Sequence, residues 1–153
     1  MAAKKEKKKQ AQYYEAVGRR KEATARVRLY TITGDSVDVN GTSVKKGEIV
    51  VNKKPVEQYF PGEVAKRIYL EPFRTTNTVG RFTVSALVTG GGSYGQMGAF
   101  IHAVSRVLQD IDKDKFRSIL KKRGFLKRDP RMKERRKAGL AQSARAKKQS
   151  PKR

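Results

Sequence analysis

The positive charge of this chain is concentrated at its two ends, which limits where a folded core can form. Residues 1–28 contain 10 Lys and Arg against 3 Asp and Glu, and residues 121–153 contain 15 against 2. Residues 29–120 contain 12 against 9, so the middle of the chain is nearly neutral. Self-repulsion opposes the compaction of a like-charged segment that has no anionic partner. We therefore expect one neutral folded body with cationic extensions.

Composition excludes several classes of function. The 153 residues carry a net charge of +23, which is typical of one compact domain with tails that bind nucleic acid. Because there is no cysteine, disulfides, thiolate zinc sites and cysteine nucleophiles are excluded. No apolar run approaches the roughly 18 residues of a membrane span, and the Lys-rich start has no apolar region of a secretory signal. We expect no membrane partner.

The apolar pattern of the middle of the chain predicts a small sheet covered by helices. Residues 81–89 alternate as a strand, and residues 93–111 then have apolar side chains at helical spacing. A second helix is expected over residues 113–123, ended by Gly124. Shorter elements are expected at 25–29, 37–39, 49–51, 55–60 and 63–70. The predicted fold class for residues 13–123 is α+β, with a small mixed sheet covered on one face by helices.

The N-terminal part predicts two further features. Residues 1–12 are rich in Lys, Gln and Ala and are expected to be disordered. Residues 13–30 are interpreted as an extended arm that is interrupted at Gly18–Lys21. Within this arm the alternation of apolar and basic residues places Arg26 and Arg28 on the same face.

Residues 90–95, with the sequence GGGSYG, formally match the GxGxxG pattern between a strand and a helix. Three interpretations remain. A tight turn that needs glycine is favoured, the same turn holding an RNA phosphate at the helix start comes second, and a nucleotide cofactor comes last. The cofactor fingerprint needs an acidic residue at the end of a following parallel strand, and the sequence predicts no such strand.

His102 is the only histidine, and it has no second His or Cys with which to hold a metal. On the predicted helix it shares a stripe with Gly98 and Arg106. This stripe is either a solvated helix edge or an RNA-facing surface.

The C-terminal segment, residues 124–153, carries the strongest local signal. Asp129 can cap a helix whose first residue is Pro130, and Gly139 can end it, which predicts a helix at about 130–138. About nine residues are too few for a stable isolated helix, so we expect it to fold on a polyanion rather than to stay a solvated face. Residues 141–153 contain no aromatic residue, which favours phosphate contacts over base stacking.

Five short motifs occur in order along the chain and carry a resemblance to one family. They are Gly18-Arg19-Arg20-Lys21 with Ala25-Arg26-Val27-Arg28, Glu57-Gln58-Tyr59-Phe60-Pro61, Gly90-Gly91-Gly92 to Gly98-Ala99, Arg128-Asp129-Pro130-Arg131-Met132, and a Lys-Arg terminus. From about Tyr13 to Arg153 the chain resembles protein nine of the small ribosomal subunit in its bacterial form.

The resemblance implies a body like the second domain of ribosomal protein five and a place in the head of the small subunit of the cytoplasmic ribosome. The implied partners are the 3′ major domain of the ribosomal RNA, neighbouring ribosomal proteins and the P-site tRNA. It implies no enzyme, no cofactor and no small-molecule substrate. Two features depart from the family: Pro151 precedes the terminal Lys-Arg, and about a dozen extra residues around 35–46 form an inserted hairpin without an assigned function.

The predicted site residues follow from these segments. We expect Lys152 and Arg153 to contact phosphates of the tRNA anticodon stem-loop. The residues expected to bind ribosomal RNA are Arg19, Arg20, Lys21, Arg26, Arg28, Gly91, Gly92, Gln96, His102, Arg106, Lys127, Arg128, Arg131, Arg135, Arg136, Lys137, Arg145, Lys147 and Lys148. Two alternatives stay open: a free-standing nonspecific RNA-binding protein or RNA chaperone, and a small enzyme that uses the glycine turn.

Overall fold

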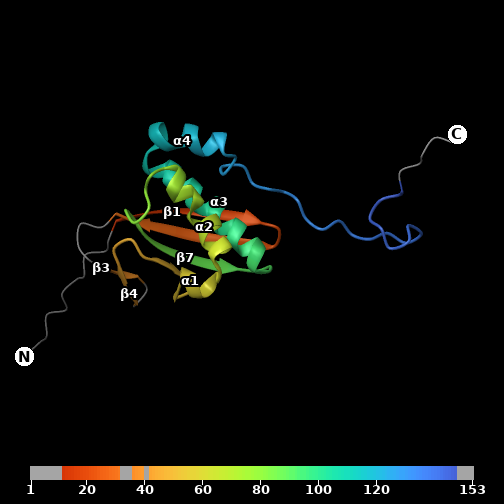
Figure 1. Cartoon of the computed structure of the whole chain (residues 1–153), viewed down its shortest axis with the longest axis horizontal. Helices are drawn as coiled ribbons and strands as arrows, with labels where there is room; N and C mark the ends of the chain where they lie inside the picture. Colours follow the sequence, from red (N-terminus) through yellow and green to blue (C-terminus); the bar gives the residue numbers. More distant parts are fainter. Residues whose placement is uncertain (1–11, 32–35, 40–41, 148–153) are drawn as a thin grey trace, which may run out of the picture.

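The computed structural model describes residues 12–31, 36–39 and 42–147 (Figure 1). The expectation of disorder for residues 1–12 therefore lies outside this range, apart from Gln12. In chain order the elements are β1 (Tyr13–Arg20), β2 (Ala23–Tyr30), β3 (Ser36–Val39), β4 (Thr42–Lys45), β5 (Ile49–Val51), β6 (Lys54–Pro55), α1 (Val56–Tyr59), α2 (Glu63–Thr75), β7 (Thr83–Thr89), α3 (Ser93–Ile111) and α4 (Lys113–Lys122).

Five strands form the main sheet in the order β1-β2-β7-β5-β6. The pairing of β5 with β7 is parallel and the other pairings are antiparallel, so the sheet is mixed. Strands β3 and β4 form a separate two-stranded hairpin. Helices α2, α3 and α4 lie together on one side of the main sheet (Figure 1). The predicted α+β fold with a one-sided helical layer is confirmed.

The alternation predicted for the central strands places one face in the core. On β2, Ala25, Val27 and Leu29 are completely buried, whereas Arg26 is exposed. Their neighbours on β7 and the inner face of α3 complete the same core, with Val84, Val88, Phe100, Val104 and Leu108 all buried. Each large apolar side chain buried in this way stabilises the fold by roughly 1.5–3 kcal/mol. No helix in the described ranges is long and apolar enough to span a membrane.

The tightest packing in the body joins β1 to α3 at Gly18. A Cβ atom at this position would lie 2.2 Å from the carbonyl oxygen of Ala99 and 2.3 Å from the backbone nitrogen of Ala103. Ala99 and Ala103 are themselves completely buried. The small residues at these three positions allow the backbone of the strand to approach the helix closely, as a larger side chain could not.

Residues 13–30 are a β-hairpin of the main sheet, so the predicted extended arm with a break at Gly18 is wrong. The strand continues through Gly18 to Arg20, and the chain reverses at Lys21 and Glu22, where Lys21 has a φ of +50°. The pairing of Gly18 with Ala25 keeps this glycine in the sheet. The glycine serves the contact with α3 rather than a turn.

Two other predicted elements differ in extent. Helix α2 continues to Thr75, beyond the expected end at residue 70, although Pro72 lies inside it. Tyr69 and Phe73, one turn apart, are both buried, and this packing holds the helix through the proline. The predicted inserted hairpin is present as β3 and β4, and its Asn40-Gly41 turn lies outside the described residues.

Gly18→Ser is expected to lower the free energy of unfolding by about 3 kcal/mol, because the added side chain meets backbone atoms of α3 that cannot move independently. Gly92→Ser is the matched control, since a Cβ at Gly92 meets nothing within 4 Å, and it is expected to change stability by less than about 0.5 kcal/mol. Urea unfolding followed by circular dichroism measures both. Equal losses in the two variants would contradict the close packing of β1 on α3.

Candidate nucleic-acid interface

The exposed edge of β1 is closed by two side chains of α3. The backbone N–H of Arg19 donates to Nδ1 of His102 (3.3 Å), and the guanidinium of Arg106 donates to the carbonyl oxygen of Val17. His102 and Arg106 lie one helical turn apart, so they occupy the place of a neighbouring strand. Because a bare strand edge can pair with other chains, this arrangement protects the edge.

His102 is therefore not a solvated helix edge. Burial is the main cause that lowers its pKa, and the positive charges of Arg106 and Arg128 lower the pKa further. A backbone hydrogen bond with Leu126 offsets part of this effect. The imidazole is neutral at pH 7 and its Nδ1 accepts a hydrogen bond. Within the described residues no group of three or more His, Cys, Asp or Glu could hold a metal ion.

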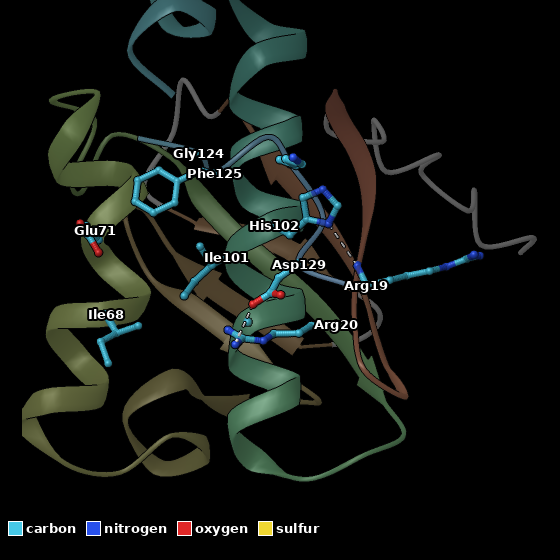
Figure 2. Close-up of a pocket in the computed structure, with 11 residues that line it drawn as sticks. Arg19, Arg20, Ile68, Glu71, Ile101, His102, Gly124, Phe125 and Asp129 are labelled. Carbon is cyan, nitrogen blue, oxygen red and sulfur yellow. Dashed lines mark hydrogen bonds and ion pairs between the residues drawn. The ribbon is translucent and has the colours of Figure 1, made fainter. Parts of the chain in front are cut away.

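Arg20 joins the hairpin, α3 and the start of the C-terminal segment. Its side chain crosses Gly98, where a Cβ would lie 2.2 Å from Cδ of the arginine, and its guanidinium lies 4.8 Å from the centre of the Tyr94 ring. It forms an ion pair of 3.1 Å with Asp129 (Figure 2). Most of the side chain is covered, so Arg20 is placed to hold the protein together rather than to face a ligand.

Asp129 binds two arginines at once. Its carboxylate accepts hydrogen bonds from the backbone N–H of Arg131 (3.1 Å) and from the Arg131 guanidinium (3.0 and 2.9 Å). These bonds, with a smaller contribution from the charge of Arg20, hold the pKa of Asp129 well below its usual range. The clasp formed by Arg20, Asp129 and Arg131 fixes where the C-terminal segment leaves the body.

The helix predicted at residues 130–138 is absent from the structure. Residues 130–137 have no helical or strand conformation and run away from the body (Figure 1). Asp129 accepts a hydrogen bond from the backbone N–H of Arg131, as a helix cap would, but no helical turn follows this bond. Nine residues with several like charges also lack the packing that would offset the cost of helix nucleation. That the helix forms when a polyanion binds stays a prediction.

Further along, the C-terminal segment folds back on itself. Arg145 forms an ion pair of 2.8 Å with Glu134, and Arg136 donates to the side chain of Gln142 (3.1 Å). The backbone N–H of Lys137 donates to the carbonyl oxygen of Ser143 (3.1 Å). The side chain of Lys137 is left exposed on the outside of this loop.

The sheet face opposite the helices carries the predicted pair of arginines, but they differ in environment. Arg28 forms an ion pair with Glu15 and lies 4.7 Å from the centre of the Tyr13 ring. The hydrogen bond that Arg28 donates to the Glu15 carboxylate raises the pKa of Arg28. Arg26 is exposed and forms no such pair among the described residues. Arg26 is thus the arginine of this face that is available to a ligand.

The glycine turn is explained by its contact with the β1–β2 hairpin. Gly90 and Gly91 have φ values of +74° and +61°, and a Cβ at Gly90 would lie 2.5 Å from the carbonyl oxygen of Glu22. Gln96 closes the turn from inside, because its Nε2 donates to the carbonyl oxygen of Gly90 (3.1 Å). The favoured interpretation, a tight turn, accounts for the motif. Gly91 and Gly92 are exposed, and an RNA phosphate at this turn stays a prediction.

Gln96 belongs to an internal polar network that the sequence did not reveal. Its Oε1 accepts a hydrogen bond from the Tyr59 hydroxyl (2.9 Å), and Asn52 donates to the same hydroxyl oxygen (3.1 Å). The Asn52 side-chain amide also donates to the carbonyl oxygen of Val88 (2.8 Å) and accepts from the backbone N–H of Val88 (2.9 Å), as the backbone of a neighbouring strand would. Of the predicted RNA-binding residues, Gln96 is thus committed to the fold.

Apart from Gly91, Gly92 and His102, which are described above, the predicted site residues fall into three groups. Arg20, Arg28, Gln96, Arg131, Arg136 and Arg145 are engaged by other side chains of the protein. The second group has exposed basic side chains that form no ion pair within the described part of the chain, and consists of Arg19, Lys21, Arg26, Arg106, Lys127, Arg128, Arg135, Lys137 and Lys147. The remaining predicted residues Lys148, Lys152 and Arg153 lie outside the described residues. One exposed aromatic residue, Tyr94, was missed and lies beside Arg20 and Lys21.

Comparisons with known proteins agree on one family. The family model of ribosomal protein S9/S16 matches residues 18–153. A relative from Leifsonia xyli subsp. xyli (strain CTCB07), named small ribosomal subunit protein uS9, is 44% identical over 131 residues. The match covers 86% of this chain and 70% of the relative.

The stability of the body is expected to fall as the pH drops below 6.5, the ordinary pKa of histidine. Folding lowers the pKa of His102, so between this lowered pKa and pH 6.5 the unfolded chain binds more protons than the folded chain. The contribution of neutral His102 to the free energy of unfolding is therefore complete only above pH 6.5 and is lost as the pH falls below it. In His102→Asn the side-chain oxygen can still accept the Arg19 N–H but does not titrate. Urea unfolding at pH 7.5 and 5.5 should show a smaller loss in this variant, and an equal loss would contradict the prediction.

Proposed function

Because the chain belongs to the ribosomal protein S9/S16 family, we propose that it binds the 3′ major domain of ribosomal RNA in the head of the small subunit. It is a structural protein of the small ribosomal subunit and not an enzyme, and it is located on the ribosome in the cytoplasm. Its partners are ribosomal RNA and neighbouring ribosomal proteins.

The observation that carries the proposal is the distribution of unpaired cations over the molecule. Acidic partners neutralise some of the basic residues, such as Arg20 and Arg28, and these hold the fold together. Among the predicted site residues, the exposed basic ones without ion pairs lie along the β1 edge, on the open face of the sheet and along the C-terminal segment, and further exposed basic residues such as Arg117 and Lys122 lie on α4. The positive charges of such a surface repel one another in the free protein, and a bound polyanion reduces this repulsion.

The binding mode follows from the side chains available. Lys and Arg contact phosphate oxygens and fix the orientation of a protein on RNA without reading sequence. The C-terminal segment has no aromatic residue beyond Phe125, so base stacking contributes little there. Selectivity for one RNA must then come from its shape, which places several phosphates in register with the rigid body.

We further propose that the C-terminal segment reaches the P-site tRNA. The resemblance of the motifs to the small-subunit family supports this role, in which Lys152 and Arg153 contact phosphates of the anticodon stem-loop. The described part of the segment leaves the body and is exposed (Figure 1), as such a reach requires. Phosphate contacts at its end would accept any tRNA.

The full chain is expected to prefer a 3′ major domain fragment over an unrelated RNA of equal length, and to keep this preference as salt is raised. Affinity for both RNAs falls with salt, by roughly 0.9 in log K per duplex phosphate neutralised for each tenfold rise in salt, because bound counterions are released. Competition binding over a salt series measures the ratio of the two affinities. Equal affinity at every salt concentration would favour a free-standing nonspecific RNA-binding protein or RNA chaperone.

Deletion of Ser150–Arg153 is expected to leave the body folded and assembled into small subunits, while P-site tRNA binding weakens about tenfold, as expected for the loss of one or two charge-assisted contacts. The double variant Lys152→Gln and Arg153→Gln is the control that removes charge and keeps length. Filter binding of tRNA to reconstituted subunits measures the effect. Failure of the deleted chain to assemble would show that the terminus anchors the protein instead.

A further inference from the structure

We propose that the cleft between β1, α3 and the residues after α4 binds a single phosphodiester group of ribosomal RNA. This β1–α3 cleft is lined by Val17, Arg19, His102, Arg106 and Arg128. The inference rests on the proposed RNA-binding function and assigns it one defined site.

The lining of the β1–α3 cleft is cationic and contains no carboxylate. Arg128 is exposed and has no ion pair or hydrogen bond through its side chain within the described part of the chain. The guanidinium of Arg106 uses one nitrogen for the Val17 carbonyl and keeps its other N–H groups free. Arg19 lines the cleft, and the end of its side chain extends away from His102 (Figure 2).

Three separate parts of the sequence supply these arginines, and each is fixed by the fold. Arg19 is held in β1, which pairs with β2, and Arg106 is held in the last half of α3. Arg128 precedes Asp129, which Arg20 clasps to the body at 3.1 Å. The cations therefore stay close together although they repel one another. An anion between them removes this repulsion, and the planar guanidinium suits a phosphate because it can donate two parallel hydrogen bonds.

The neighbouring cavity on the other side of His102 does not offer the same chemistry. It is lined in part by Glu71 and Asp129, whose carboxylates repel a phosphate, together with Arg20 and Lys127 (Figure 2). His102 and Arg19 line both cavities. The charged groups around His102 are Arg19 from β1, Arg106 from its own helix and Arg128 after α4, with Arg20, Glu71, Lys127 and Asp129 in the neighbouring cavity.

His102 reports on the cleft directly, because it is the only histidine in the chain. A phosphate bound beside it favours the protonated imidazole, so the midpoint of its titration must rise. The full chain, labelled with ¹³C on histidine, is titrated with pH by NMR, alone and with saturating short RNA hairpin. A rise of about one pH unit on addition of RNA is expected.

Arg128→Gln and Arg135→Gln form a matched pair, since both remove one exposed arginine from the C-terminal segment. In the free protein, Arg128→Gln is expected to raise the pH midpoint of the His102 titration, because one nearby positive charge is lost. In this variant, RNA is expected to cause no additional rise of the midpoint. Arg135→Gln keeps the wild-type response to RNA. In both variants the slope of log K against log salt falls by roughly 0.7–0.9, the value for one lost phosphate contact.

The proposed phosphate site is contradicted if RNA binds without changing the pH midpoint of the His102 titration. It is also contradicted if RNA changes this midpoint equally in Arg128→Gln and in the wild type. Either result leaves the proposed function intact. Absence of any RNA binding by the full chain would overturn the proposed function and the cleft together. Inorganic phosphate replaces the hairpin in a second titration. A larger rise with the hairpin than with phosphate at equal phosphate concentration identifies RNA as the source of the phosphate, whereas an equal rise would reduce the site to a general anion site and overturn the RNA assignment.

Discussion

The contact between β1 and α3 is the constraint on which the rest of the molecule depends. Gly18 places the strand backbone against Ala99 and Ala103, closer than any side chain would permit. This approach also brings the polar edge of β1 within hydrogen-bonding distance of His102 and Arg106. The same contact therefore packs the core, closes the edge of the sheet and sets the position of the cationic cleft.

Features that depend on neighbouring residues could be predicted from the sequence. The alternation of β7, the apolar stripe of α3 and the glycine after α4 are all local patterns, and the structure confirms them. The placement of Arg26 on the sheet face away from the core followed from the same period of two. The family resemblance agreed with these patterns, and the comparisons confirm it.

Features that depend on distant residues could not be predicted. Gly18 was interpreted as part of a break in the arm, whereas the residues that require a glycine at this position lie on α3. Asp129 has the ordinary appearance of a helix cap before a proline, and nothing nearby in the sequence indicates that its carboxylate also pairs with Arg20 of the first hairpin. Likewise, no local signal assigns His102 to the backbone N–H of Arg19. In each case a tertiary contact overrides a plausible local interpretation.

The hairpin of β3 and β4 lies outside the main sheet but shares an apolar cluster with it. Val37 and Val44 pair across the hairpin and bury Tyr30 at the end of β2 and Val50 of β5. Removal of the hairpin would leave a tyrosine and a valine of the main sheet in contact with water. A shorter homologue that lacks this hairpin must therefore place other atoms over these two side chains, or carry smaller or more polar residues where they stand.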